Sequence, residues 1–276
     1  DTVGATEDQI RNARHGYYAN TSYFDDWLGK LVATVEETGH ADNTIIILTA
    51  DHGDMLGERG QWFKMSMFER SARVPFIMAG PGIPAATIGN ACSHLDFLPT
   101  LLDVASGDGK AWPALGSELD GRSLWHLATG GTDEVDETTG EYCAEMTSYP
   151  IFMIRRGSMK YIHCDTDPPL MYDLAADPDE TTNLASDPGH AATAAAFAAE
   201  VAARWDSEAI RQDVLASQRA RRTLHAAMTG SGVSWDHEPV RDVANEYVRN
   251  HMDWAEAGPA MRFPRLDSAT EIADRD

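Results

Sequence analysis

The spacing of apolar and polar residues predicts an α/β protein in which helices frame a set of short strands. Apolar residues recur every three or four positions over residues 6–39, which indicates a long amphipathic helix. An unbroken apolar run at residues 45–48 is typical of a strand buried on both faces, as in a parallel sheet covered by helices. A second short buried strand is expected within residues 71–80, before a turn rich in proline and glycine.

The pattern of the second half of the chain is different. Three short strands are expected at residues 141–147, 150–156 and 159–164, and the short turns between them predict an antiparallel meander. An alanine-rich helix should follow at residues 187–205, and another helix should begin near residue 207 and end before residue 230.

A stretch of glycine, threonine and acidic residues at positions 130–140 predicts a loop and a subdomain boundary. We therefore expect an α/β region at residues 1–129, a small antiparallel β subdomain at 130–186, and helices with a C-terminal extension at 187–276. A lone helix before one parallel strand is not a complete sheet, so we expect the start of the chain to lie inside a larger domain.

The composition narrows the classes of partner. The 276 residues carry a formal net charge of −22, which argues against nucleic acid as a ligand. The hydrophobic content of 43% is enough for a core, and no apolar run approaches the length of a membrane span. Three widely spaced cysteines without a zinc-binding pattern favour a reducing compartment, so we expect a cytoplasmic protein, with the periplasm as the alternative.

Asp51 and His52 are the first candidates for chemistry, because they come at the carboxyl end of the strand expected at residues 45–48. Neighbouring residues on a regular strand point to opposite faces, so the two side chains can converge on one ion only where the strand gives way to a turn. Gly53 permits such a turn. The alternative is an aspartate that caps the next helix beside a histidine hydrogen-bonded at the sheet edge. We favour a site for a divalent metal.

The segment that contains these residues, TADHGDMLGERGQWFKMSMFERSARVPFIMAGPGI, resembles the metal-and-lysine segment of the type I sulfatases. These enzymes belong to the alkaline phosphatase-like superfamily, and within the family the likeness to choline sulfatases is strongest. The triplet Asp-His-Gly is shared with two-metal phosphotransferases, whereas Gly-Glu-Arg-Gly followed by an aromatic pair and Lys64 is much more specific. The resemblance implies the C-terminal part of an alkaline phosphatase-like sulfatase core, with a small antiparallel subdomain and a helical extension.

The resemblance also implies roles for three residues. Asp51 and His52 would ligate one divalent cation, with Ca²⁺ the first expectation and Mn²⁺ or Mg²⁺ the alternatives. Lys64 would reach the sulfate group or the leaving oxygen, where a fixed ammonium stabilises the charge that develops in the transition state. Most lysines are merely solvated, but this chain has only four lysines among its 22 basic residues, so Lys64 is not the default cation of the composition.

Other segments extend the resemblance over nearly the whole chain. Asp96 precedes a Leu-Pro-Thr-Leu helix start, where the family uses its aspartate for architecture. Residues 120–124 match a family connector, and residues 170–184 resemble the closing hairpin of sulfatase C-terminal subdomains. The tail at residues 234–266 is similar to the C-terminal extension of choline sulfatases, which implies a homo-oligomer assembled through that tail.

The nucleophile of the family has no counterpart in these residues. Type I sulfatases use a formylglycine made from the first residue of a Cys-x-Pro/Ala-x-Arg motif, and neither Cys92, Cys143 nor Cys164 begins such a motif. The paired metal aspartates and the catalytic arginine, lysine and histidine of the family's N-terminal half are missing too. The chain therefore resembles the C-terminal half of a sulfatase, and we expect the N-terminal half of the same enzyme to be its partner and to carry the formylglycine.

The substrate that this likeness implies is a small sulfate ester, choline-O-sulfate, which would be hydrolysed to choline and sulfate. A trimethylammonium group cannot donate a hydrogen bond, so a site for it needs aromatic faces and a carboxylate. By resemblance Glu145 supplies the carboxylate, with Glu141 as the rival and a solvated strand residue as the alternative. Trp62, next to the Lys64 loop, is a candidate for an aromatic face, and so are tail residues such as Trp235 or Tyr247, whose alternative role is an oligomer contact.

Two other kinds of function stay open. Within enzymes, the chain could belong to an aryl or alkyl sulfatase, or to a phosphate or phosphonate ester hydrolase of the same superfamily. If it is not part of an enzyme, it could be a non-catalytic binding or assembly module that retains the remnant of a metal site. In either case we expect the 276 residues alone to be inactive, because they contain candidate metal ligands without a nucleophile.

Overall fold

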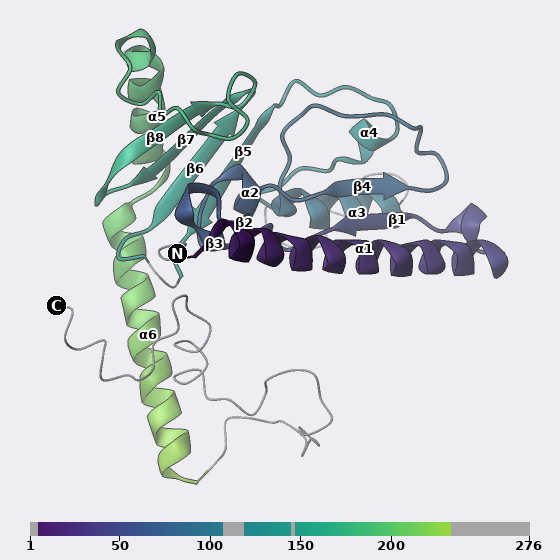
Figure 1. Cartoon of the computed structure of the whole chain (residues 1–276), viewed down its shortest axis with the longest axis horizontal. Coiled ribbons are helices and arrows are strands. Elements are labelled where there is room, and N and C mark those ends of the chain that lie inside the picture. The colour runs from purple at the N-terminus through teal and green to yellow at the C-terminus, as the bar shows by residue number, and fades with distance from the viewer. Residues whose placement is uncertain (1–4, 107–118, 145–146, 233–276) are drawn as a thin grey trace. The chain divides into compact units, whose positions relative to one another are not determined.

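The computed structural model describes residues 5–106, 119–144 and 147–232, and it mixes helices with three small antiparallel sheets (Figure 1). These residues fall into two compact units. Of the described residues, the first unit comprises 5–24, 55–63 and 213–232, and the second comprises those within 25–54 and 64–212. The three regions expected from the sequence are divided differently from these two units. The units do not test that division, which remains a prediction.

Helix α1 (Glu7–Glu37) confirms the long amphipathic helix. The backbone N–H of Thr6 donates to Gln9 over 2.8 Å and the backbone N–H of Gln9 donates to the Thr6 hydroxyl over 3.3 Å, which is the expected capping box. Gly39 follows the helix at φ 73°, a left-handed conformation with which many helices end. None of the described α1 residues is buried, and aromatic side chains such as Tyr23 and Trp27 are more than half exposed.

Strand β1 (Ile46–Thr49) pairs antiparallel with strand β4 (Phe76–Ala79), from Ile46 opposite Ala79 to Thr49 opposite Phe76. The expectation of a parallel strand buried on both faces is therefore wrong for the described residues, in which all four β1 residues are half-buried. An unbroken apolar run fixes neither the direction of the neighbouring strand nor the cover on its faces. The second strand starts later than expected because the short helix α2 (Glu69–Ala72) precedes it.

The first unit contains a short hairpin made by β2 (Met55–Leu56) and β3 (Trp62–Phe63). The turn between these strands is strained, since Arg59 at φ 55° and Phe63 at φ 72° adopt left-handed conformations without being glycine. The side chain of Arg14 ties helix α1 to this hairpin, because its Nε donates to the Leu56 carbonyl over 2.8 Å.

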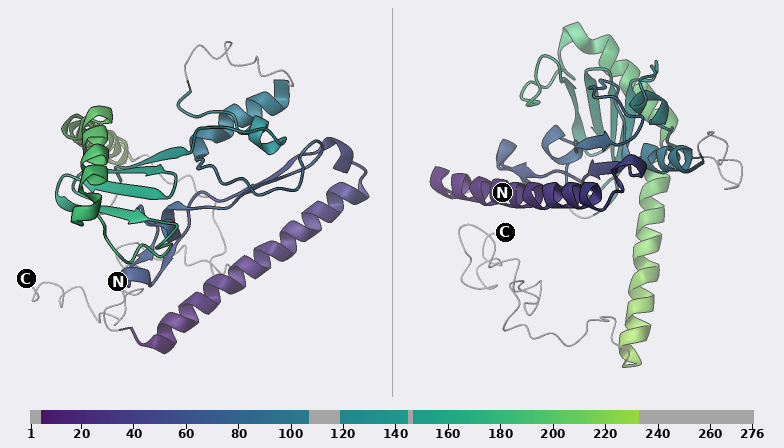
Figure 2. Two further views of the ribbon diagram at one scale, coloured as in Figure 1. Left: turned by 90° about the horizontal axis from the view of Figure 1, so that it is seen from above. Right: turned by 90° about the vertical axis from the view of Figure 1, so that its right-hand side faces the viewer.

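Strands β5 (Glu137–Tyr142), β6 (Ile151–Arg156), β7 (Met159–Cys164) and β8 (Asp167–Asp173) form one antiparallel sheet in chain order, which confirms the meander. Strand β5 begins at residue 137, so the loop expected at 130–140 is wrong for its last four residues. Figures 1 and 2 show this sheet with helix α5 (Ala191–Arg204) running across one of its faces.

The core of the subdomain lies between helix α5 and the sheet. Phe197 and Val201 of α5 pack with a cluster of buried sheet residues, namely Phe152, Ile154, Tyr161 and Met171. The rings of Tyr161 and Phe197 stack with centroids 5.6 Å apart, a geometry that adds about 1 kcal/mol to the area that they bury. Asp187 begins this stretch by accepting from the Gly189 N–H, and the 24-residue helix α6 (Ser207–Gly230) follows α5.

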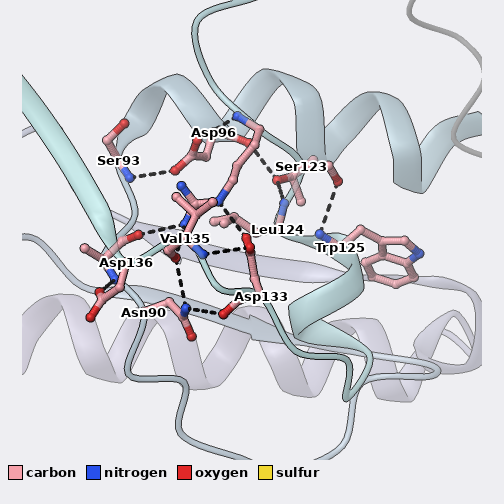
Figure 3. Close-up of polar contacts among 12 residues, drawn as sticks. Asn90, Ser93, Asp96, Ser123, Leu124, Trp125, Asp133, Val135 and Asp136 are labelled. Carbon is pink, nitrogen blue, oxygen red and sulfur yellow. Dashed lines mark hydrogen bonds and ion pairs between the residues drawn. The ribbon is translucent and has the colours of Figure 1, made fainter. Parts of the chain in front are cut away.

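Asp96 organises the loops around helices α3 (Phe97–Ser106) and α4 (Trp125–Ala128), as Figure 3 shows. Its buried carboxylate accepts from the backbone N–H groups of Ser93 and Arg122 over 2.9 and 2.8 Å. The fully buried Thr100 hydroxyl donates to the Asp96 carbonyl over 2.6 Å and accepts from the Leu124 N–H over 2.8 Å. The expectation of an architectural aspartate at this position is confirmed.

None of the described helices combines the length and the apolar composition that crossing a bilayer requires. The three cysteines are free thiols, with Cys92 exposed and Cys164 buried. Although Cys92 is exposed as a residue, the protein atoms around its thiol partly exclude water from the sulfur, and this desolvation, followed by the nearby carboxylate of Asp96, raises the pKa of the thiol.

Candidate active site

Asp51 and His52 follow strand β1 and their side chains converge, as expected for residues in a turn. The His52 backbone N–H donates to Asp51 Oδ1 over 3.0 Å, and His52 Nε2 lies 3.3 Å from Asp51 Oδ2. The Asp51 side chain is 85% exposed and the His52 side chain 31%. Asp51 caps none of the described helices, so its alternative role as a helix cap is not observed in this part of the chain.

The imidazole of His52 is oriented by the residue that follows it. Its Nδ1 lies 2.8 Å from the Gly53 carbonyl oxygen, and a carbonyl accepts only from an N–H, so Nδ1 carries the proton. Nε2, the other ring nitrogen, is the one that lies 3.3 Å from the Asp51 carboxylate. One nitrogen and one carboxylate oxygen that face each other fit a divalent cation. In the part of the chain that is described, no group of three or more histidine, cysteine or acidic side chains is placed to hold a metal, so the pair is a partial ligand set.

Gly53 is required here for a reason different from the one that the sequence suggested. Its φ is not in the left-handed region, but a Cβ at this position would lie 2.3 Å from the Arg70 carbonyl oxygen. The Gly53 N–H donates to the Ser71 carbonyl over 2.8 Å. The absence of a side chain thus lets the turn that carries Asp51 and His52 pack directly on helix α2.

Lys64 has an anchored backbone and an exposed side chain. Its carbonyl accepts from the Ser71 hydroxyl over 2.5 Å and from the Ser66 N–H over 2.8 Å. Within the described residues no carboxylate pairs with its ammonium, which therefore remains available to a ligand. Lys64 and the Asp51–His52 turn lie in the same compact unit and are tied to the same helix.

Ser71 is the residue at the candidate site that reasoning from the sequence missed. It is 1% exposed, and it holds the Lys64 carbonyl with its hydroxyl and the Gly53 N–H with its carbonyl. The available signal was a serine embedded between charged residues just before an apolar strand, which by itself also fits a solvated turn.

The candidate substrate residues have three different outcomes. Trp62 is half-buried opposite Leu56 in the hairpin of the other unit, and its expected place beside the ligand is not tested. Glu145, Trp235 and Tyr247 lie outside the described residues. The rival carboxylate of Glu141 accepts from Trp205 Nε1 over 2.6 Å, and the Trp205 ring stacks on Phe152 at 4.8 Å, so Glu141 already has a structural partner.

A separate cleft of about 700 Å³ lies between the Asp96 loops and strand β5, and Figure 3 shows part of its wall. Its arginines are already paired: Arg122 with Asp133 at 2.9 Å, and both Arg156 and Arg204 with Glu200, at 2.8 and 2.5 Å. The backbone N–H of Val135, followed by the Arg122 guanidinium, holds the pKa of Asp133 below its ordinary value. This cleft lies apart from Asp51, His52 and Lys64, and its charges satisfy one another.

Three family models match the chain. The model described as Sulfatase matches residues 2–107, the C-terminal model of N-sulphoglucosamine sulphohydrolase matches residues 57–206, and the C-terminal model of choline sulfatase matches residues 212–263. The chain belongs to the sulfatase family. Within that family it is choline sulfatase-like, as its motifs indicated.

Individual relatives agree with this assignment. The sulfatase chain is 41% identical to the choline-sulfatase of Rhizobium meliloti (strain 1021), covering 94% of this chain and 51% of that protein. It is 30% identical to arylsulfatase K of Rattus norvegicus, covering 90% of this chain and 44% of the relative. The chain thus spans about half the length of the curated relatives that it matches.

Solved structures confirm the alkaline phosphatase-like fold class for this sulfatase. A 2-O GAG sulfatase matches with a TM-score of 0.61 and 25% identity, covering 86% of this chain and 48% of its own. The phosphonate monoester hydrolase of Agrobacterium radiobacter matches with a TM-score of 0.60 and 28% identity, covering 72% of this chain and 42% of its own.

Proposed function

We propose that the full-length protein is a sulfuric ester hydrolase that converts choline-O-sulfate and water to choline and sulfate. The observation that carries the proposal is the convergence of Asp51 and His52, 3.3 Å apart, on a turn fixed to the same short helix as Lys64. The 41% identity to a choline-sulfatase, extending over 94% of the chain, supports the choice of substrate.

Asp51 and His52 would hold one divalent cation, Ca²⁺ by first preference, with further ligands from another part of the enzyme. When bound, the cation would neutralise negative charge on the sulfate oxygens. The chain's own contribution is to present an ionised carboxylate beside an imidazole whose Nδ1 proton is held by the Gly53 carbonyl.

Lys64 would stabilise the leaving side of the ester. The alkoxide of choline is a poor leaving group, so charge builds up on its oxygen as the S–O bond breaks, and an ammonium placed there lowers the barrier. The free side chain of Lys64 suits this task because its backbone is fixed by Ser71 while its ammonium has no competing carboxylate among the described residues.

The remaining parts of the proposal, apart from the ring of Trp62, lie outside the described residues. A formylglycine nucleophile would come from a preceding segment of the same enzyme, and the C-terminal tail would assemble a homo-oligomer. Glu145 and the ring of Trp62 would face the trimethylammonium group, for which a carboxylate and aromatic faces are the suitable partners.

A second candidate function is hydrolysis of a phosphate or phosphonate ester. The specific observation in its favour is the likeness to the phosphonate monoester hydrolase of Agrobacterium radiobacter, at 28% identity. A phosphonate monoester also places negative charge on its non-bridging oxygens, so the same cation site and lysine would serve it. A non-catalytic assembly role has less support, because it does not explain why a lysine with no carboxylate partner among the described residues is tied to the same helix as the Asp51–His52 turn.

The deciding experiment uses the full-length protein purified with Ca²⁺. Release of sulfate and choline from choline-O-sulfate is measured beside release of alcohol from a phosphonate monoester, and Lys64→Ala is the matched control for contaminating activity. We expect kcat/KM to favour the sulfate ester. A preference for the phosphonate ester would overturn the proposed substrate class, and no turnover of either ester would favour the assembly role.

A further inference from the structure

Lys160 is the most unusual charged residue in the described structure. It is the second residue of strand β7, its side chain is 0% exposed, and it is one of only four lysines in the chain. Its Nζ donates to Glu69 Oε1 over 2.9 Å and lies 2.9 Å from Glu180 Oε1. Lysine is almost never fully buried unless it is paired, so these two contacts are what keeps its charge inside the protein.

The partners of Lys160 are themselves held tightly. The side chains of Glu69 and Glu180 are 13% and 3% exposed. Glu180 adopts a left-handed φ of 55°, which is unfavourable for a residue other than glycine and persists only when its surroundings enforce it. Its second carboxylate oxygen, Oε2, accepts from the Glu69 backbone N–H over 2.7 Å. Glu180, a residue in a strained conformation, thus contacts Lys160 with one carboxylate oxygen and the first residue of helix α2 with the other.

The buried charges are connected to the candidate active site through helix α2. Glu69 is the first residue of that helix, and Ser71 stands two positions later. The Ser71 hydroxyl donates to the Lys64 carbonyl over 2.5 Å, and the Ser71 carbonyl accepts from the Gly53 N–H over 2.8 Å. Helix α2 is therefore the link between the backbone of Lys64 and the turn that carries Asp51 and His52, and a displacement of α2 would disturb both attachments.

We propose that Lys160, Glu69 and Glu180 are positioning residues that set the location of Lys64 relative to the Asp51–His52 turn through helix α2 and Ser71. The role of Lys64 in this inference rests on the proposed function. A four-residue helix has few contacts of its own to fix it, and its first residue, Glu69, is held by an ion pair from Lys160 of β7 and by a backbone hydrogen bond to Glu180 of the loop after β8.

The proposal makes a specific kinetic prediction for the full-length enzyme. Displacing the Lys64 ammonium should lower kcat most when the leaving group is poor. The kcat for an alkyl sulfate should therefore fall more than the kcat for 4-nitrophenyl sulfate. We expect Ser71→Ala and Glu69→Ala each to lower kcat for choline-O-sulfate about tenfold and kcat for the aryl ester less than about threefold. KM should change little, and Glu69→Gln, which keeps an acceptor for Lys160, should recover most of the loss.

Controls separate positioning from general destabilisation. Glu69→Ala leaves one ammonium and one carboxylate, so it avoids the unpaired buried charge that Lys160→Met would create. Thr100→Val removes another buried hydroxyl with two hydrogen bonds, remote from Lys64, and should not change the ratio of the two kcat values. In a Lys64→Ala background, Ser71→Ala should cause no further loss for choline-O-sulfate, because the group that it positions is already gone.

Hydrogen–deuterium exchange tests the connection without any turnover. Glu69→Ala should speed exchange of the Gly53 amide about tenfold while amides in the centre of β6 and β7 keep their protection. Equal loss on both esters, undiminished in the Lys64→Ala background, would overturn the proposal, and so would an unchanged Gly53 amide. If the wild-type protein turned over neither ester, the proposed function would fail and the exchange result alone would decide whether this connection exists.

Discussion

His52 Nδ1 lies 2.8 Å from the Gly53 carbonyl oxygen, and this contact fixes the tautomer of the imidazole. His52 Nε2 lies 3.3 Å from Asp51 Oδ2. Because the imidazole is already oriented, this nitrogen and this oxygen are close enough to bind one cation together, which reduces the reorganisation that binding requires.

Asp51→Ala should abolish divalent-dependent sulfate release by the full-length enzyme while leaving its fold intact. The carboxylate supplies charge that no neutral side chain replaces, and its side chain is 85% exposed, so we expect the free energy of unfolding to change by less than about 0.5 kcal/mol. Sulfate release, calorimetric Ca²⁺ binding and Tm would be measured beside the exposed control Asp42→Ala. Full activity of Asp51→Ala with saturating divalent ion would falsify the assignment of this ligand.

Gly53→Ala should damage the site more than its conservative chemistry suggests. The new Cβ would lie 2.3 Å from the Arg70 carbonyl oxygen, so the turn must shift away from α2 at a cost of about 1–3 kcal/mol. We expect weaker Ca²⁺ binding and a lower Tm. The matched control is Gly189→Ala, whose Cβ would meet only ordinary contacts at 3.6 Å. Wild-type Ca²⁺ affinity in Gly53→Ala would show that the close approach is unimportant.

Glu145→Gln should raise KM for choline-O-sulfate strongly and leave turnover of a neutral aryl sulfate nearly unchanged. The carboxylate, if it faces the trimethylammonium group, contributes only to substrates that carry that charge. Initial rates on both esters would be compared in the full-length enzyme. Equal losses on the two esters would indicate a structural role, and no effect on either would move the carboxylate elsewhere.

The rival residue gives the opposite expectation. Glu141→Gln weakens the 2.6 Å bond to the Trp205 indole, which should lower the free energy of unfolding by about 1 kcal/mol and leave the ratio of KM values for the two esters unchanged. Thermal unfolding followed by Trp fluorescence would measure the first effect. A selective rise in KM for choline-O-sulfate in Glu141→Gln would transfer the substrate role to this residue.

The elements with strong local signals were predictable from the sequence. The capping box at Thr6 and the turn centred on Gly157 each fix a boundary through nearby residues, so α1 and the β6–β7 hairpin came out as expected. The direction of β1 relative to its neighbour was not predicted correctly, because the pairing of β1 depends on a strand about 30 positions away that ends at Ala79. Lys160 was missed for the same reason, since Glu69 is 91 positions away and a lysine in a strand looks solvated until its partners are known. Ser71 was missed although Lys64 is only seven positions away, because a serine between charged residues carries no pattern of its own.

The 276-residue chain on its own should release no sulfate from choline-O-sulfate. It carries candidate metal ligands and Lys64 but no Cys-x-Pro/Ala-x-Arg segment for a nucleophile. We also expect it to self-associate, because aromatic residues of α1 such as Trp27 are more than half exposed and β1 has a single strand partner in the described part. Sulfate release above background by the purified chain, or a monodisperse chain that melts cooperatively, would contradict these two expectations in turn.

Glu200 should make the small subdomain sensitive to acid. Hydrogen bonds from Arg156, followed by Arg204, hold the pKa of Glu200 below its ordinary value of 4.5. The folded state therefore binds this proton less readily than the unfolded state, so the stabilisation is present above pH 4.5 and is lost as the pH falls through the lower folded pKa. Tm should fall less steeply between pH 5 and pH 3 in Glu200→Gln than in the wild type. Parallel curves would contradict the linkage.

The buried pairing of Lys160 also bears on the order in which the protein matures during synthesis. Glu69 is separated from Lys160 by 91 positions and from Glu180 by 111. At about 5–20 residues per second, a ribosome needs on the order of ten seconds to move from the first residue to the last. Until the β7–β8 hairpin and the loop after it have emerged, Glu69 of helix α2 lacks both of its partners, Lys160 and Glu180. The segment around Lys64 should thus reach its final geometry late in synthesis. A chain that is still on the ribosome would then lack a fully formed site for the sulfate group.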